Sequence, residues 1–249
     1  MRIAAIADAH GNRLALEAVL EDIRAAAPDL VVNLGDLVSG PFDPAGAAEA
    51  QMALGCPTLA GNHERQVLSG GGPSDIFARG CLSAAHRDWI TGLPKTLSLL
   101  DGAVFACHGS PAGGDLDYLL EDVSSGRAVL AAEDAIAPKL AGIEEAGLVL
   151  CGHTHTQRAV WVRGVLVVNP GSVGFPAYRD TAPVPHAMEA GSPHARYALL
   201  TRGAAGWAVE LRAVPYDWEG AARQAEANGR PEAAHAVRTG RVLARAGAG

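Results

Sequence analysis

The 249-residue chain contains few cysteines, and their spacing excludes some classes of protein. Its four cysteines form no Cys-X-X-Cys pair, so neither a disulfide framework nor a zinc ribbon is expected. Cys107 and Cys151 each end an apolar run, and a free cysteine usually behaves as a small buried hydrophobe. We therefore expect both side chains to lie in the core.

Positive charge is also scarce, with 20 basic against 27 acidic residues and a formal net charge of −7. A long nucleic acid requires a basic stripe that neutralises its phosphates, and the sequence shows none. We therefore expect no long nucleic acid as a partner. A small phosphate-containing ligand is still compatible with this charge.

Long apolar segments are absent as well. No stretch of about 18 apolar residues occurs, so we expect no membrane span. The first residues, MRIAAIADAH, begin like a secretory signal, but Asp8 and His10 interrupt the apolar run early. The expected location is the cytoplasm.

The first part of the chain predicts alternating strands and helices. Apolar runs at 2–7 and 29–34 flank a helix over 12–26, in which apolar residues recur every three or four positions. A strand–helix–strand unit of this size implies parallel pairing. Helices are also expected over 43–54 and within 74–93, and a short third strand over 56–61.

The second half predicts mostly antiparallel strands. A hairpin is expected where Asp101-Gly102 joins 96–100 to 103–108, and another where 159–169 turns near Arg163-Gly164. The other expected elements are two helical segments between 116 and 145, a buried strand over 147–152, two strands over 196–214 and two short helices around 226–232.

This order predicts an α/β protein in which two mixed sheets face each other with helices outside. We assign residues 1–214 to one domain and 215–249 to a helical extension packed on or beside it. The glycine-rich segment 68–74 lacks the ending of a phosphate-binding loop and is predicted to be a flexible connector. Segment 174–194 has four prolines and no apolar period, which predicts a long surface loop.

Polar residues collect where the predicted strands end. Ligands of open α/β sheets bind beyond the carboxyl ends of the strands, so we expect these side chains in one crevice. They are Asp8, His10 and Asn12 after the first strand, Asp36 after the second, Asn62, His63 and Glu64 after the third, His108 after the hairpin strand, and His153 and His155 after 147–152.

Each of these residues also has an ordinary structural explanation. An Asp after a strand is usually a turn residue or a helix cap, and a lone His is more often a core or surface residue than a ligand. That explanation is preferred for His86, His186, His194 and His235. Five strand ends at one sheet edge, however, would require five independent coincidences, which favours a shared site.

The residue types indicate which ligand the site binds. Nitrogen and oxygen donors without thiolate suit Mn, Fe, Zn, Co or Ni better than Cu(I) or an iron–sulfur cluster. The set is too large for one ion and suits two ions that share a bridge. Two ions about 3.5–4 Å apart can clamp a phosphoryl group and lower the pKa of a bound water to about 7.

The order Asp-X-His, Gly-Asp, Gly-Asn-His-Glu, His and Gly-His-Thr-His resembles the calcineurin-like metallophosphoesterase superfamily. The resemblance covers roughly residues 1–172, including Asn-Pro-Gly-Ser at 169–172, which resembles a segment of the compact bacterial phosphodiesterase-like members. It implies a four-layer α/β/β/α sandwich with two mixed β-sheets.

The resemblance also implies roles for the metal-binding residues. Asp36 resembles the carboxylate that bridges two divalent metal ions. The ligands of the first ion would be Asp8, His10 and His155, and those of the second Asn62, His108 and His153. Residues two apart face the same side of an extended chain, so His153 and His155 are expected to point into the site together.

Other residues are assigned to the reaction itself. His63 resembles the residue placed near the leaving group, and an ordinary imidazole pKa near 6.5 suits a general acid around neutral pH. Asn12 and Arg179 are candidate substrate-binding residues. Glu64 is predicted to be an exposed carboxylate that interacts favourably with the start of a helix.

One segment departs from a branch of the family. The Ser/Thr protein phosphatases carry Gly-Asp-X-X-Asp-Arg-Gly after the second strand, whereas this chain has GDLVSG at 35–40. The arginine that would grip phosphate is absent, so a protein phosphatase is disfavoured. Arg13, Arg65 and Arg179 are candidate replacements.

The predicted activity is hydrolysis of a small phosphate ester by in-line attack of a hydroxide held between two metal ions, with a phosphodiester preferred. One alternative is a phosphomonoesterase acting on a nucleotide or sugar phosphate. Another is a non-catalytic scaffold of the same fold, which would tolerate lost ligands, whereas this chain retains all seven. A homodimer formed through the C-terminal helices is left open.

Overall fold

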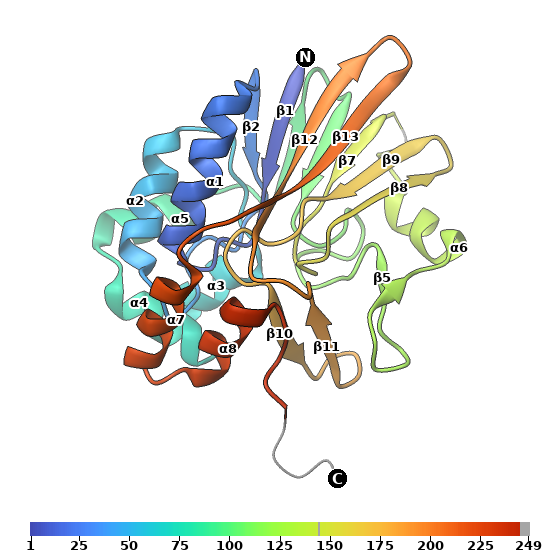
Figure 1. Ribbon diagram of the computed structural model, residues 1–249. Helices are drawn as coiled ribbons and strands as arrows, with labels where there is room; N and C mark the ends of the chain where they lie inside the picture. Colours follow the sequence, from blue (N-terminus) through green and yellow to red (C-terminus); the bar gives the residue numbers. More distant parts are fainter. Residues whose placement is uncertain (144, 245–249) are drawn as a thin grey trace.

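Two larger β-sheets lie face to face in a computed structural model that describes residues 1–143 and 145–244 (Figure 1). The four-stranded sheet has the order β13 (Gly206–Val214), β12 (Ala195–Gly203), β1 (Arg2–Ile6) and β2 (Leu30–Asn33). The five-stranded sheet has the order β3 (Thr96–Leu99), β4 (Val104–Cys107), β7 (Leu148–Leu150), β9 (Val165–Asn169) and β8 (Arg158–Val162). Both sheets mix parallel and antiparallel pairs, as predicted.

Strand β1 is apolar throughout because both of its faces are covered. Ile3 and Ala5 belong to the core between the two sheets, whereas Ala4 and Ile6 pack with helix α1 (Arg13–Ala26). A strand buried on both faces carries a continuous apolar run instead of an alternating pattern. This burial explains why the short apolar runs of the sequence identified the central strands.

Helices cover the outer faces of both sheets (Figure 1). On the side of the four-stranded sheet, α1 buries Leu16, Val19 and Ile23 at helical spacing. The other helices of the first half are α2 (Pro44–Leu54), α3 (Asn62–Ser69), α4 (Pro73–Cys81) and α5 (Ala84–Thr91). The five-stranded sheet is covered by the shorter α6 (Glu133–Ile136) and the 3-10 helix η1 (Ala137–Leu140).

The C-terminal helices α7 (Trp218–Ala227) and α8 (Pro231–Thr239) pack on the rest of the chain. Ala225 and Val237 lie in one apolar cluster with Phe42 and Phe175. The division of the chain at residue 214 and the homodimer stay predictions, and residues 245–249 of the predicted extension lie outside the described residues. Within the described ranges, every helix is too short or too polar to cross a membrane.

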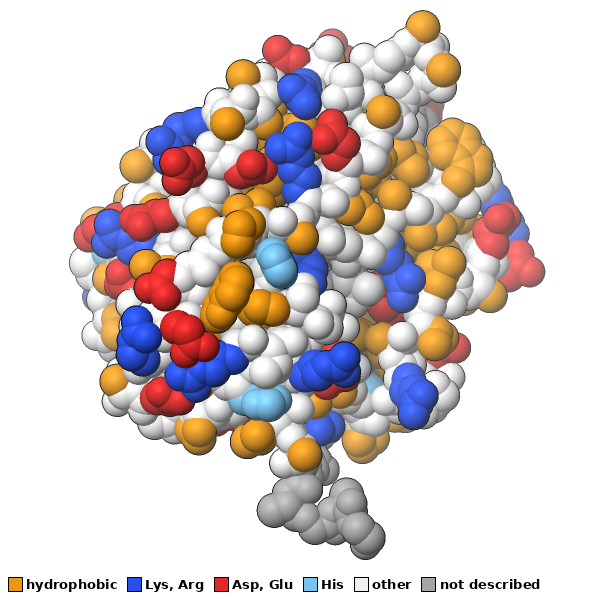
Figure 2. Space-filling view, viewed as in Figure 1, with side chains coloured by type: hydrophobic (Ala, Val, Ile, Leu, Met, Phe, Trp, Pro, Cys, Tyr) orange, Lys and Arg blue, Asp and Glu red, His pale blue; other side chains and the backbone are white. Residues whose placement is uncertain are grey.

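The surface carries charges of both signs. On the face in Figure 2, Lys and Arg side chains alternate with Asp and Glu side chains among the described residues. Salt bridges of the described residues include Arg238 with Glu219 at 2.9 Å and Arg212 with Glu210 at 2.9 Å. The positive charge on the face in Figure 2 is therefore dispersed among acidic side chains.

Two predicted elements are wrong. Segment 56–61 forms only an isolated parallel bridge between Thr58 and Asn33. Pro57 has no N–H to donate, and the N–H of Ala60 bonds the carbonyl of Pro94 instead of a strand. The first helical segment expected after residue 116 is a small hairpin of β5 (Glu121–Asp122) and β6 (Val129–Leu130), and residue 144 lies outside the described residues.

The predicted surface loop at 174–194 contains a second small hairpin. Strands β10 (Ala177–Asp180) and β11 (His186–Glu189) pair antiparallel, with Tyr178 opposite Met188. Both strands have only four residues, which is too short for a periodic pattern to emerge from the sequence. Pro183 and Pro185 fall in the connection between them, where no ladder hydrogen bond is needed.

Candidate metal centre

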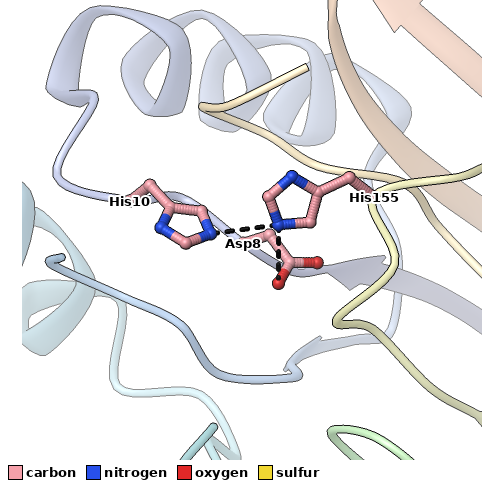
Figure 3. Close-up of side chains that lie close together, drawn as sticks. All are labelled: Asp8, His10 and His155. Atoms are coloured by element: carbon pink, nitrogen blue, oxygen red, sulfur yellow. Dashed lines mark hydrogen bonds and ion pairs between the residues drawn. The ribbon is translucent and has the colours of Figure 1, made fainter. Parts of the chain in front are cut away.

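Six of the predicted ligands form two groups at one end of the sheets. One group is Asp8, His10 and His155, drawn in Figure 3, and the other is Asp36, His108 and His153. Within each group the ligand atoms lie within 4.8 Å of one another, and every residue is at most 8% exposed. The expectation of a single sheet edge is therefore wrong: the parallel pair β1–β2 of one sheet and the parallel pair β4–β7 of the other bring the ligands together at the carboxyl ends of their strands.

The backbone of these ligands is unusual. Positive φ angles are found at Asp8 (57°), His10 (48°), Asp36 (56°), His153 (68°) and His155 (57°). A left-handed conformation at a non-glycine residue costs on the order of 1–3 kcal/mol and clusters at functional sites. The expectation of an extended chain through His153 and His155 is wrong, because β7 ends at Leu150 and the loop turns at each histidine.

Backbone carbonyls fix the orientation of three imidazoles. The Nδ1–H group of His10 donates to Ser39 O at 2.7 Å, and that of His108 donates to Leu34 O at 2.7 Å. The Nδ1–H group of His155 donates to Phe175 O at 2.5 Å. A carbonyl can only accept, so Nδ1 carries the hydrogen and Nε2 of the neutral ring keeps its lone pair. Metal-binding histidines are typically held in this way.

These lone pairs face each other in the first group. The Nε2 atoms of His10 and His155 are 3.0 Å apart, and His155 Nε2 is 3.5 Å from Asp8 Oδ1 (Figure 3). Two acceptor nitrogens and a carboxylate at such distances repel one another unless a positive charge lies among them. The arrangement therefore suits a cation.

Asp36, a member of the second group, also faces the first group. Its Oδ2 atom is 3.1 Å from His108 Nε2 in the second group and 3.8 Å from His10 Nε2 in the first. Its Oδ1 atom accepts a hydrogen bond from the backbone N–H of His63 at 2.9 Å. One carboxylate oxygen is thus directed toward both groups while the other is held by the start of α3.

Several buried polar atoms of the site have no hydrogen-bond partner among the described residues. They are both carboxylate oxygens of Asp8 and Oδ1 of Asn62. A buried polar atom without a partner is costly, so such atoms are rare unless a ligand satisfies them. Both residues belong to the predicted ligand set, whose oxygen and imidazole donors fit divalent transition-metal ions.

The site also controls the charge of its histidines. Burial lowers the pKa of His10 to about 3 and that of His153 to about 4, so both rings are neutral at pH 7 and available as ligands. Burial lowers the pKa of His108 too, but the carboxylates of Asp36 and Asp8 outweigh it and raise the value to about 10. These carboxylates therefore favour positive charge at this point of the site.

His63 lies in the same cavity and has an acidic partner that the sequence analysis missed. Its Nδ1 atom is 2.6 Å from Asp75 Oδ1, and Asp75 also accepts hydrogen bonds from Ser39 Oγ at 2.8 Å and Gly72 N at 2.7 Å. Burial lowers the pKa of His63, but Asp36 and Asp75 outweigh it and raise the pKa to about 9. The ring is therefore protonated at neutral pH.

The glycine-rich segment before Asp75 is a short link between α3 and α4 that positions this carboxylate. Gly72 is the N-cap of α4, and Asp75 occupies the third helical position, where an acidic side chain can bond the N–H of the cap. That spacing from Gly72 to Asp75 was the available sequence signal.

Glu64 is buried, so the prediction of an exposed carboxylate is wrong. It is 1% exposed, and its oxygens accept backbone N–H groups of Asp36 at 2.8 Å, Leu37 at 2.8 Å and Gly61 at 2.7 Å. The start of α3 lies against the loop after β2, which removes Glu64 from water. Burial raises its pKa to about 7.

The two predicted substrate-binding residues lie in different surroundings. Arg179 lines a cavity of about 410 Å³ together with His63 and three of the candidate ligands, His10, His153 and His155. Asn12 is fully buried and is not among the residues that line it. Its Oδ1 caps α1 through Ala15 N, and its Nδ2 donates to Gly174 O, so the geometry gives it a structural role.

The other two arginines considered as phosphate ligands are paired with acids. Arg65 bonds Asp115 at 2.9 Å, and Arg13 bonds Glu17 at 2.7 Å. Neither lines the cavity that holds His63. Arg179 is thus the one candidate of the three placed to meet a ligand there.

The β10–β11 hairpin supports the loop that carries His153 and His155. Tyr178 Oη donates to His153 O at 3.1 Å, and its ring meets the His155 ring edge-on with centroids 4.7 Å apart. Tyr118 packs against His153 with centroids 5.1 Å apart and bonds His186 Nε2 at 3.0 Å. Segment 174–194 is therefore part of the site's support.

The two-sheet fold and the paired ligand groups together define a metal-dependent phosphoesterase. The chain belongs to the calcineurin-like phosphoesterase superfamily, because the model of that superfamily domain matches residues 1–188. The match covers the elements from β1 to β11 and every residue of the two ligand groups. The family resemblance found in the sequence is confirmed.

Three individual proteins are similar to this chain. A metallophosphoesterase from Sphaerobacter thermophilus is 25% identical, with a TM-score of 0.71 over 95% of this chain and 98% of its own. A hypothetical protein from Pyrococcus horikoshii is 20% identical, with a TM-score of 0.73 over 96% and 98%, and shows the same fold. An uncharacterized protein from Methanocaldococcus jannaschii is 24% identical over 70% of this chain and 76% of its own.

Metal binding should stabilise the folded protein. Adding Mn²⁺ at about 100 times its Kd to chelator-treated protein should contribute about 2.7 kcal/mol, because the ion binds the folded state. The substitution Asp8→Asn should reduce this gain and the metal content, as measured by calorimetry and elemental analysis. Asp88→Asn, on the exposed face of α5, is the matched control. An unchanged gain in the Asp8 variant would contradict the ligand assignment.

Removing the Glu64 carboxylate should loosen the loop that holds Asp36. A glutamine places an N–H₂ group against backbone N–H donors, so Glu64→Gln should lower the free energy of unfolding by about 2 kcal/mol. Chemical denaturation measures this loss. Glu21→Gln, at an exposed position of α1, should change stability by less than about 0.5 kcal/mol. Equal effects of the two substitutions would exclude the proposed hydrogen-bonding role.

Proposed function

We propose that this protein is a phosphodiesterase that hydrolyses a small phosphate ester with the help of two divalent metal ions. The observation that supports it best is one cavity lined by members of both ligand groups and by His63. Membership of a phosphoesterase family supports the reaction class. The geometry of Asp36, directed at both groups, supports two ions rather than one.

The proposed ligands divide as the two groups do. Asp8, His10 and His155 would hold one ion, Asn62, His108 and His153 the other, and Asp36 would contact both. Mn, Fe, Zn, Co and Ni all suit this donor set. When bound, two such ions would supply charge neutralisation for phosphoryl oxygens and would lower the pKa of a bound water toward neutral pH.

His63 is proposed as the general acid. Its Nδ1–H donates to Asp75, which leaves Nε2–H free to protonate the departing alkoxide oxygen. Its pKa near 9 keeps this proton in place at pH 7. Asp75 acts as a positioning residue because it orients the ring and favours its protonated form.

The charge of the cavity favours a diester over a monoester. Among the described residues, Arg179 is the sole Lys or Arg that lines the cavity. Its Nη2 also donates a hydrogen bond to Leu243 O at 3.3 Å. A diester carries one negative charge, whereas a monoester carries up to two at neutral pH. Beyond the two proposed ions and the protonated His63, this lining therefore offers one cationic side chain, and the carboxylate of Asp180 disfavours the second negative charge of a monoester.

The pair formed by His63 and Asp75 favours the enzyme over a non-catalytic scaffold. A protein-binding scaffold needs neither a protonated histidine in the cavity nor a buried carboxylate that orients it. Asp75 is 2% exposed and makes three hydrogen bonds around His63. Such a pair is most simply explained by proton transfer.

The preference between ester types can be measured with a common leaving group. With added Mn²⁺, kcat/KM for bis(p-nitrophenyl) phosphate should exceed that for p-nitrophenyl phosphate by about tenfold or more. The additional negative charge of the monoester is repelled by about 1.4 kcal/mol or more in a partly buried site, and about 1.4 kcal/mol corresponds to a factor of ten. Release of nitrophenolate reports both rates. A higher value for the monoester would replace the diesterase by the phosphatase alternative.

The general acid should matter most for poor leaving groups. His63→Ala should lower kcat by about 10²–10⁴ for an alkyl ester and far less for a p-nitrophenyl ester, whose leaving group needs no proton. His235→Ala on α8, a histidine that does not line the cavity, is the control. Full activity of the His63 variant on the alkyl ester would remove this residue from the mechanism.

The pH profile should identify Asp75. Because the pKa of His63 is raised to about 9, activity on the alkyl ester should fall as pH rises through about 9. Asp75→Asn removes a cause of that increase, so the falling limb should move to lower pH. Because His63 binds its proton more tightly in the folded protein than in the unfolded chain, its protonation adds to the free energy of unfolding. This contribution is complete below about pH 6.5 and is lost as pH rises through about 9. An unmoved limb would show that Asp75 does not act through His63.

A further inference from the structure

A second cavity adjoins the cavity of the metal centre. Its volume is about 530 Å³, and the two cavities share four lining residues: Leu116, His153, Asp180 and Ala182. His153 therefore has the candidate phosphate site on one side and the second cavity on the other. A molecule bound at the metal centre can extend past His153 into this space.

The second cavity is lined by the predicted surface loop at 174–194 and by a segment for which the sequence analysis expected a helix. Pro183 and Val184 belong to the connection of the β10–β11 hairpin, and Val123 and Ser124 follow β5. Tyr118 also lines the cavity, and its ring packs against that of His153. The hairpin at 174–194 thus separates the two cavities at Asp180 and Ala182 and shapes both of them.

The lining of this cavity is acidic. It includes four carboxylates against one amine, that of Lys139, and the carboxylates are Asp117, Glu121, Asp122 and Asp180. The Lys139 amine is already bonded to Asp117 Oδ1 at 2.8 Å and Tyr118 O at 2.6 Å. Little positive charge is left to meet a ligand.

The negative charge of the lining is carried mainly by two of its carboxylates. Glu121 is 5% exposed, and its Oε1 accepts a hydrogen bond from Arg158 Nε at 2.8 Å, so its charge is offset by an ion pair. Asp122 and Asp180 have no ion pair with a Lys or Arg among the described residues. An anionic ligand would meet these two unpaired charges, whereas a hydroxyl or amine donor can hydrogen-bond to them.

We propose that the second cavity binds the alcohol substituent of the phosphodiester that is not the leaving group, and that it selects substituents without negative charge. This inference rests on the proposed diesterase function and deepens it. A neutral polyol or nucleoside, or a cationic amino alcohol, meets the carboxylates favourably. A substituent that carries an additional phosphate is repelled by them.

A matched pair of substrates tests the selection. Thymidine 5′-(p-nitrophenyl phosphate) and its 3′-phosphorylated form share the leaving group and differ by one phosphate in the other substituent. With Mn²⁺-loaded full-length protein, kcat/KM should be about tenfold higher for the form without the 3′-phosphate, and added salt should reduce this ratio. A ratio of one or below would overturn the proposed selectivity.

Two substitutions connect the effect to the cavity. Asp122→Lys reverses a charge of the lining and should move the ratio toward one, whereas Asp101→Lys, on the exposed turn between β3 and β4, should leave it unchanged. Ser124→Trp fills part of the cavity and should lower the activity on the thymidine diester relative to that on p-nitrophenyl phosphate. Ala204→Trp, in the exposed turn between β12 and β13, is its control.

The outcomes separate this inference from the function on which it rests. Hydrolysis of none of the esters by metal-loaded protein would overturn the proposed function and the subsite with it. Hydrolysis of diesters with equal effects of Ser124→Trp and Ala204→Trp would overturn the subsite alone. A thermal denaturation scan of each variant distinguishes loss of the fold from loss of the site.

Discussion

The position of the Asp36 carboxylate is the constraint on which the rest of the site depends. It is buried between His10 of one ligand group and His108 of the other, and each group combines residues that follow strands of both sheets. Its backbone N–H is held by Glu64, and its Oδ1 by the N–H of His63. The start of α3 therefore fixes the carboxylate and places the proposed general acid beside it.

Holding so many ligands in one place requires a strained backbone. Parallel strands end about 4.8 Å apart, and each loop must turn sharply to direct its side chain inward. Left-handed residues at Asp8, Asp36 and His153 make these turns, and packing from outside maintains them. Tyr178 and Tyr118 provide this packing for the His153 loop, which gives the β10–β11 hairpin a role in both the metal centre and the adjoining cavity.

The motifs predicted the ligands because the chemistry needs particular side chains directly after buried strands. The apolar runs around Ala4 and Val149 marked those strands, and both are buried on two faces. The residues that position the ligands and His63 are marked by weaker sequence patterns. Asp75 and Glu64 look like ordinary helix-start acids in the sequence, and only the placement of α3 and α4 shows that one orients His63 and the other holds the Asp36 loop.

The sequence by itself determined the family, the two-sheet class and the identity of the candidate ligands, because these depend on residue type and local order. The tertiary structure alone decided which acid partners His63, how the segment at 174–194 folds and which side chains support the His153 loop. Those features depend on contacts between residues far apart in the chain, such as Tyr178 with His153. Local patterns contain no information about such distances, because the packing of the two sheets sets them.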